Sequence, residues 1–105
     1  MAETLYQPKE LAAKCCINIS TLNGYLRDKE LFPPIKVDQN NGFRFYDDGT
    51  VITIELFKKL RKKPFRLTVD EVRPIIKKYD LATRAEILSK PNNELLMLLN
   101  ENTLL

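Results

Sequence analysis

The chain has 105 residues, 44% hydrophobic and 30% charged, which is enough for one domain with a modest core. No apolar run approaches the roughly 20 residues of a membrane-spanning helix, and the N-terminus lacks the basic and apolar regions of a signal peptide. We therefore expect a cytoplasmic protein rather than a secreted or membrane one.

The net charge is +3, and it is unevenly distributed. Residues 1–79 contain 15 Lys and Arg against 10 Asp and Glu, whereas residues 80–105 contain two against four. The positive surplus of residues 1–79 favours a polyanionic partner.

Two adjacent cysteines, Cys15 and Cys16, lie near the N-terminus. Neighbouring cysteines rarely bond to each other, and the chain has no histidine that would complete a zinc site. We expect reduced packing residues, with a redox-sensing or metal-sensing thiol as the alternative.

Residues 7–31 predict a helix, a tight turn and a second helix. The first should begin at Pro8, whose fixed φ suits the first helical position, and its core face is Leu11, Ala12 and Cys15. Asn18 should take the turn geometry, with Ile17 and Ile19 as apolar anchors on either side.

The second helix should begin at Ser20, whose hydroxyl suits the N-cap. Pro33 and Pro34 should end it, because proline does not continue a helix. Its inward side chains should be Leu22, Tyr25 and Leu26, while the other side carries small or polar residues.

A β-hairpin should follow, with strands over Lys36–Asp38 and Phe43–Tyr46. Asn41-Gly42 in the connection is the strongest hairpin dipeptide, because both positions accept positive φ. Alternation places Phe43 and Phe45 on one side and Arg44 and Tyr46 on the other.

A third helix should run over about Thr50–Lys62, capped by Asp47 or Asp48, with an apolar stripe of Val51, Ile54, Phe57 and Leu60. Thr68 and Glu71 have capping-box spacing for a fourth helix that ends near Tyr79. Pro74 should kink that helix or loosen its first turn.

The tail should form helices over Leu81–Ser89 and, after Pro91, from Asn92 or Asn93 to about Asn102. Residues 95–99 are apolar around most of a helix and require burial. They either fold back on the domain or pair with a second copy, and we favour a homodimer through the C-terminal helices.

The second helix has the properties of a DNA-reading helix. A helix of this kind enters the major groove with its N-terminal residues facing base edges. Ser20, Thr21, Asn23 and Arg27 are the candidate contacts, because short polar side chains donate and accept without holding the helix away. A plain solvated helix face is the alternative.

Gly24 is a further candidate in the same helix, although a mid-helix glycine is about 1 kcal/mol less stable than alanine. Something should offset that difference. We expect close packing within the domain, with close approach to DNA as the alternative.

The hairpin would act as a wing whose residues position the protein on the phosphate backbone rather than read sequence. A purely stabilising hairpin is the alternative. The candidate contacts there are Lys36, Asn40, Asn41 and Arg44, and the basic run over residues 58–66 adds Lys58 and Arg61.

These pieces together resemble the DNA-binding domain of the MerR family of bacterial regulators over residues 6 to about 78. The matching segments are Tyr6 to Cys16, Ile17 to Leu22, Leu31 to Pro34, the wing sequence Asn41 to Tyr46, and Pro64 to Leu67.

The resemblance implies a mainly α winged helix-turn-helix over residues 1–79, with residues 80–105 as a helical tail for packing or dimerisation. It implies that Ser20, Thr21, Asn23 and Arg27 lie in the major groove and that Arg44 and Tyr46 touch the backbone. We expect sequence-specific binding of double-stranded DNA by a nucleoid-associated transcriptional regulator of bacterial or phage/plasmid type.

Other functions remain open. An architectural, DNA-segregation or excisionase-like factor would use the same fold, and a degenerate winged helix would serve protein contacts alone. We expect that the chain is not an enzyme and that it binds no cofactor, metal or small-molecule effector. The reason is that it lacks histidine, a Gly-rich phosphate loop and metal-ligand spacing.

Overall fold

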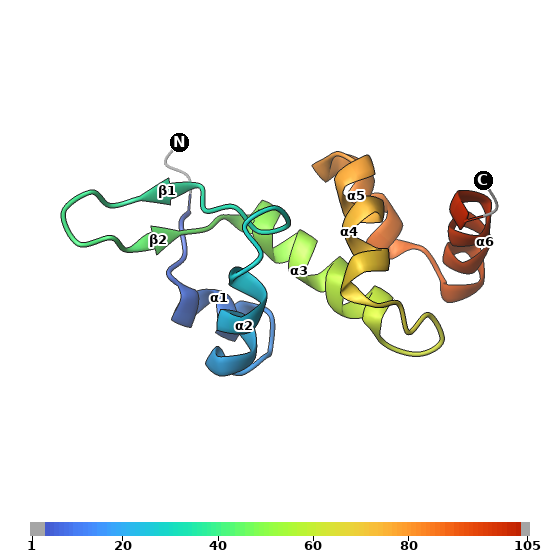
Figure 1. Cartoon of the computed structure of the whole chain (residues 1–105), viewed down its shortest axis with the longest axis horizontal. Coiled ribbons are helices and arrows are strands. Elements are labelled where there is room, and N and C mark those ends of the chain that lie inside the picture. Colours follow the sequence, from blue (N-terminus) through green and yellow to red (C-terminus); the bar gives the residue numbers. More distant parts are fainter. Residues whose placement is uncertain (1–3, 104–105) are drawn as a thin grey trace. The chain divides into compact units, whose positions relative to one another are not determined.

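A computed structural model describes residues 4–103, which form six helices and one two-stranded antiparallel sheet (Figure 1). This is the mainly α winged helix-turn-helix that the sequence predicts. The chain divides into two compact units, the first ending at Glu55 and the second beginning at Leu56. The predicted domain boundary between residues 79 and 80 was based on the resemblance to a known family, not on how the chain packs. It stays a prediction.

Helix α1 spans Pro8–Lys14 and begins where the proline predicts. The Gln7 amide donates to Oε1 of Glu10 at 3.1 Å and so satisfies one backbone N–H at the helix start. Leu11, Ala12 and Cys15 are buried, as their spacing predicts.

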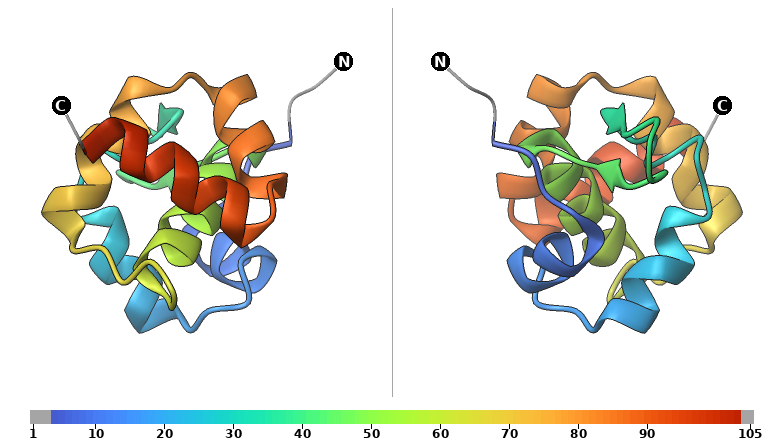
Figure 2. Two further views of the ribbon diagram at one scale, coloured as in Figure 1. Left: turned by 90° about the vertical axis from the view of Figure 1, so that its right-hand side faces the viewer. Right: turned by 90° about the vertical axis from the view of Figure 1, so that its left-hand side faces the viewer.

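Helix α2 spans Ile19–Leu26, and its start corrects the prediction that Ser20 is the N-cap. The N-cap is Asn18, whose Oδ1 accepts a hydrogen bond from the Thr21 amide at 2.8 Å. Leu22 and Leu26 are buried, and α1 and α2 pack against each other (Figure 2).

The turn between α1 and α2 places its left-handed residue at Cys16, with φ of 56°, and not at Asn18 as predicted. The Cys16 amide donates to Ala13 O at 3.3 Å, and the Ile17 amide donates to Ala12 O at 3.1 Å. Both cysteines are free, and Cys15 is buried while Cys16 is exposed. The prediction of a packing role therefore holds for Cys15 only.

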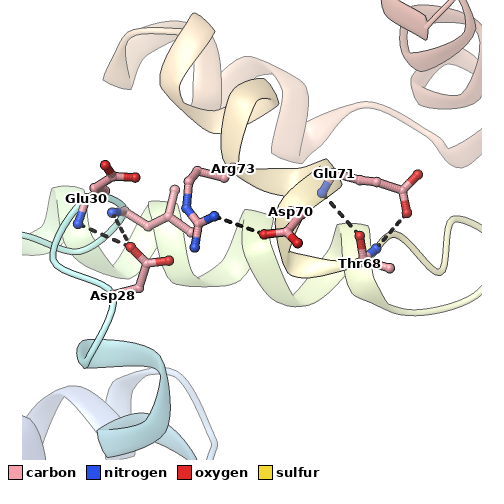
Figure 3. Close-up of polar contacts among 7 residues, drawn as sticks. Asp28, Glu30, Thr68, Asp70, Glu71 and Arg73 are labelled. Atoms are coloured by element: carbon pink, nitrogen blue, oxygen red, sulfur yellow. Dashed lines mark hydrogen bonds and ion pairs between the residues drawn. The ribbon is translucent and has the colours of Figure 1, made fainter.

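Helix α2 ends before Pro33 and Pro34, which were predicted to end it. Oδ1 of Asp28 accepts hydrogen bonds from the amides of Glu30 at 3.2 Å and Leu31 at 3.3 Å, which holds the chain in a turn (Figure 3). The prolines follow this turn.

The wing is a hairpin of β1, Lys36–Val37, and β2, Arg44–Phe45, in which Lys36 pairs with Phe45 and Val37 with Arg44. Both strands are shorter than predicted. The predicted hairpin is confirmed, and in its connecting loop only Gly42 takes a positive φ, of 74°.

The segment before α1 adds a third stretch of backbone beside β2. Tyr6 and Tyr46 form an antiparallel bridge, with amide-to-carbonyl distances of 2.6 and 2.8 Å. The hairpin is thereby joined to the start of α1 through the backbone.

Helix α3 spans Asp48–Arg61, two residues earlier at its start than predicted. Asp47 caps it, since its Oδ1 accepts from the Thr50 amide at 3.1 Å. Of the predicted stripe, the buried members are Ile54, Phe57 and Leu60, while Val51 is half-buried.

Helix α4, Val69–Lys78, begins at the predicted capping box. The Glu71 amide donates to Oγ1 of Thr68 at 3.2 Å, and the Thr68 amide donates to Oε1 of Glu71 at 3.1 Å (Figure 3). The helix continues through Pro74.

Helix α5, Leu81–Ser89, has the predicted bounds, and helix α6 spans Asn92–Thr103 after Pro91. Leu95 and Leu99 on α6 are buried within the chain, as the fold-back alternative requires, whereas Leu96 is 36% and Met97 66% exposed. Among the described helices, none has the length and apolar character needed to cross a bilayer.

Candidate nucleic-acid interface

One face of α2 is open to solvent. The helix buries Leu22 and Leu26, which leaves the other side for the predicted contact residues. All five are exposed, namely Ser20, Thr21, Asn23, Gly24 and, at the C-cap, Arg27. The second helix of the pair thus presents small and polar groups, which suits a helix that enters a groove.

Gly24 is not explained by packing. A Cβ atom built on it meets nothing within 4 Å, so the predicted close packing within the domain is wrong. Within the part of the chain that the structure describes, no neighbour requires a glycine there. The alternative, close approach of DNA to the helix backbone, stays a prediction.

A groove of about 440 Å³ lies between the exposed face of α2, the start of α1 and the wing. We call it the wing groove. Two of its lining residues, Lys9 and Arg44, are cationic and none is acidic, so it suits an anion better than a cation. The lining residues are Gln7, Pro8, Lys9, Ile19, Asn23, Gly42, Phe43 and Arg44.

The wing groove contains two exposed apolar side chains that the sequence analysis did not select. Ile19 is 41% exposed and Phe43 53%, although Ile19 was predicted to be an apolar anchor. The sequence could have indicated that Ile19 belongs to the interface, because Ile19 and the candidate contact Asn23 are four positions apart and residues at that spacing share one helix face.

On the wing, Arg44 is exposed, but its neighbour on the same side of the strand is not. Tyr46 is 1% exposed, so the interpretation of Tyr46 as a DNA contact is wrong and it is a core residue. Burial raises the pKa of Tyr46, while the nearby Arg44 guanidinium acts in the opposite direction.

The tip of the wing is held by its own polar side chains. Oδ1 of Asp38 accepts from the Asn40 amide at 2.8 Å, and Oδ1 of Asn41 accepts from the Phe43 amide at 2.9 Å. Asn40 and Asn41 are exposed, as is Lys36 on β1. All three stay candidate backbone contacts.

The remaining two candidates, Lys58 and Arg61, belong to the second unit. Lys58 is half-buried, and Arg61 is exposed with its guanidinium carbon 5.6 Å from the centre of the Phe57 ring. Lys59 has a structural role, because its ammonium donates to Leu88 O at 3.0 Å and Lys90 O at 2.9 Å. Phosphate contact by Lys58 and Arg61 stays a prediction.

The surplus of basic over acidic residues in residues 1–79 does not come from the helix-turn-helix and the wing. Residues 4–55, which carry the helix-turn-helix and the wing, have six basic and seven acidic side chains. Several of those acids satisfy backbone amides, as Asp28, Asp38 and Asp47 do. Of the six basic residues, Lys9 and Arg44 line the wing groove, where no acidic residue accompanies them.

No group of three or more metal-ligating side chains occurs in the described part of the chain. Comparison with curated proteins returns no match. The sequence profile of the MerR HTH family of regulatory proteins matches residues 6–78, which covers more than half of the chain and includes α1, α2, the wing, α3 and α4. The chain therefore belongs to the MerR HTH family, and it has the helix-turn-helix of a DNA-binding transcription regulator.

Proposed function

We propose that the chain binds double-stranded DNA sequence-specifically, as a transcriptional regulator of bacterial or phage/plasmid type. Helix α2 enters the major groove and the wing lies on the phosphate backbone. The observation that carries this proposal is the wing groove, which joins the exposed face of α2 to Arg44 of the wing and contains two cations and no acid.

The exposed face of α2 supports the major-groove placement. Asn23 has the donor and acceptor pair that matches the adenine edge, and Arg27 has the reach and donors for guanine or a phosphate. Gly24 is exposed and a Cβ built on it meets nothing within 4 Å, so the missing side chain lets the helix backbone come close to the bases. Ser20 and Thr21 add hydroxyl groups for base edges or phosphates.

The wing supports the backbone placement. Arg44 lines the wing groove, and Lys36, Asn40 and Asn41 are exposed on the same hairpin. Contacts of these residue types to phosphate fix the orientation of a protein on the duplex. Arg44 is the strongest candidate, since its guanidinium fits a phosphate with two hydrogen bonds.

We further propose that two copies pair through the tail, since Leu96 and Met97 are exposed on α6. A two-fold pair of winged helices would recognise a palindrome with half-sites at a fixed spacing.

The test is selection of bound duplexes from a random pool with the whole chain, followed by affinity measurements on the selected sequence over a range of salt. We expect an enriched motif and an affinity that falls steeply with salt. Steep salt dependence without an enriched motif would favour the architectural, segregation or excisionase-like alternative. No binding to any duplex at low salt would refute the proposal.

A further inference from the structure

The apolar side chain of Ile19 occupies an unusual place in this interface. It is the first residue of α2, it is 41% exposed, and it lines the wing groove together with Asn23 one turn later. Scattered apolar residues on a surface need no explanation. Here, however, Ile19 lies at the N-terminus of α2. In a helix-turn-helix, the N-terminal residues of the second helix face the base edges.

The chemistry of duplex DNA limits what an apolar group can contact there. In the major groove the base edges present hydrogen-bond donors and acceptors, and the one apolar group among them is the 5-methyl of thymine. The two cations of the wing groove, Lys9 and Arg44, suit a polyanion as its occupant. Ile19 lines the same groove as these two cations, so its apolar side chain is matched to a thymine methyl.

We propose that Ile19 is a specificity-determining residue that contacts the 5-methyl group of a thymine in the major groove. Asn23 reads an adenine nearby. The two residues are four positions apart on α2, about 6 Å along the helix axis, so the adenine lies within about two base pairs of the thymine. The inference deepens the proposed function and rests on it.

The test replaces thymine by deoxyuridine, one position at a time, in the duplex selected by the wild-type chain. Deoxyuridine removes the methyl and leaves the hydrogen-bonding edge intact. We expect one position at which the wild type loses about fourfold in affinity, the size expected for one buried methyl group. That position should lie within two base pairs of an adenine whose replacement is also unfavourable.

Ile19→Ala should abolish the discrimination between thymine and deoxyuridine at that position, and Ile19→Val should retain part of it. The matched control is Ile35→Ala, because Ile35 belongs to the same unit, is 48% exposed and does not line the wing groove. This control should keep the full fourfold discrimination. Melting curves of all three variants check that the fold is retained.

The possible results separate the inference from the proposed function. If the wild type binds a selected duplex but tolerates deoxyuridine at every position, or if Ile19→Ala keeps the discrimination, the inference is overturned and the proposed function stands. If the wild type binds no duplex, the proposed function fails first. Binding without an enriched motif overturns the inference together with the sequence-specific part of the proposed function.

Discussion

The hydroxyl group of Tyr6 donates a hydrogen bond of 2.7 Å to Oδ1 of Asp48, 42 positions further along the chain. Tyr6 also bridges to Tyr46 through the backbone, and Asp48 is the first residue of α3. Tyr6, two residues before the start of α1, thus contacts both the end of the wing and the start of α3. We regard Tyr6 as the residue that keeps the wing in place beside α1.

Tyr6→Phe should lower the melting temperature at pH 7, because the Asp48 carboxylate loses its hydrogen-bond donor. The same hydrogen bond, followed by burial and the charge of Asp48, raises the pKa of Tyr6. This stabilisation is complete below pH 10, about the pKa of unfolded tyrosine, and is lost as pH rises through the raised value. The difference between the two proteins should therefore narrow above about pH 10.

The measurement is thermal unfolding from pH 7 to 11. Tyr46, whose pKa burial also raises, contributes the same alkaline loss to both proteins and so cancels. Asp48→Asn keeps an acceptor but removes the charge, and it should reduce the alkaline effect. A difference that stays constant up to pH 11 would rule out this account.

Gly24→Ala should move stability and DNA affinity in opposite directions. Alanine in a helix interior is more stable than glycine by about 1 kcal/mol, and the added Cβ meets nothing within 4 Å. The same methyl group would hold α2 away from the bases. Chemical denaturation should show the gain in stability, while titration of the selected duplex should show weaker binding. Unchanged affinity would remove Gly24 from the interface.

Arg44→Ala should weaken binding to selected and random duplexes alike, because a phosphate contact carries no sequence information. Loss of one such contact should also reduce the slope of log affinity against log salt by about one. Lys29→Ala is the control, since Lys29 is exposed in the same unit and does not line the wing groove. Equal effects of the two substitutions would indicate general electrostatics rather than a wing contact.

Leu96→Glu with Met97→Glu should halve the mass measured by light scattering if the tail pairs two copies. Both side chains are exposed, so their replacement should leave the fold intact, whereas the buried Leu99 is unsuitable for such a test. Leu81→Glu is the control, because Leu81 is an exposed leucine of α5. A wild-type chain that is monomeric at every concentration would contradict the dimer.

Elements with strong local signals were predictable from the sequence. The Thr68–Glu71 capping box and the bounds of α5 depend on neighbours in the chain, and both are confirmed. The start of α2 could not be predicted in the same way, because asparagine and serine cap a helix about equally well. Asn18 and Ser20 are two residues apart, and in the structure the cap is Asn18, which follows the left-handed residue Cys16 by two positions.

The site was predictable where it depends on helix periodicity and not where it depends on distant contacts. The exposed face of α2 follows from its apolar spacing. Strand alternation places Arg44 and Tyr46 on one side but does not tell that Tyr46 is buried beside Tyr6, 40 positions away in the sequence. The wing groove, and with it Ile19 and Phe43, likewise forms from segments far apart in the sequence.

The short length of α2 limits the number of base pairs that one copy of the chain can contact. Its eight residues span roughly 12 Å at 1.5 Å per residue, the rise of about four base pairs. A word of four letters recurs by chance roughly every 256 base pairs, whereas a genome offers millions of competing positions. If α2 reads the bases as proposed, a site of about four base pairs is too short to be unique in a genome. Recognition of one promoter would then need a second copy bound beside the first.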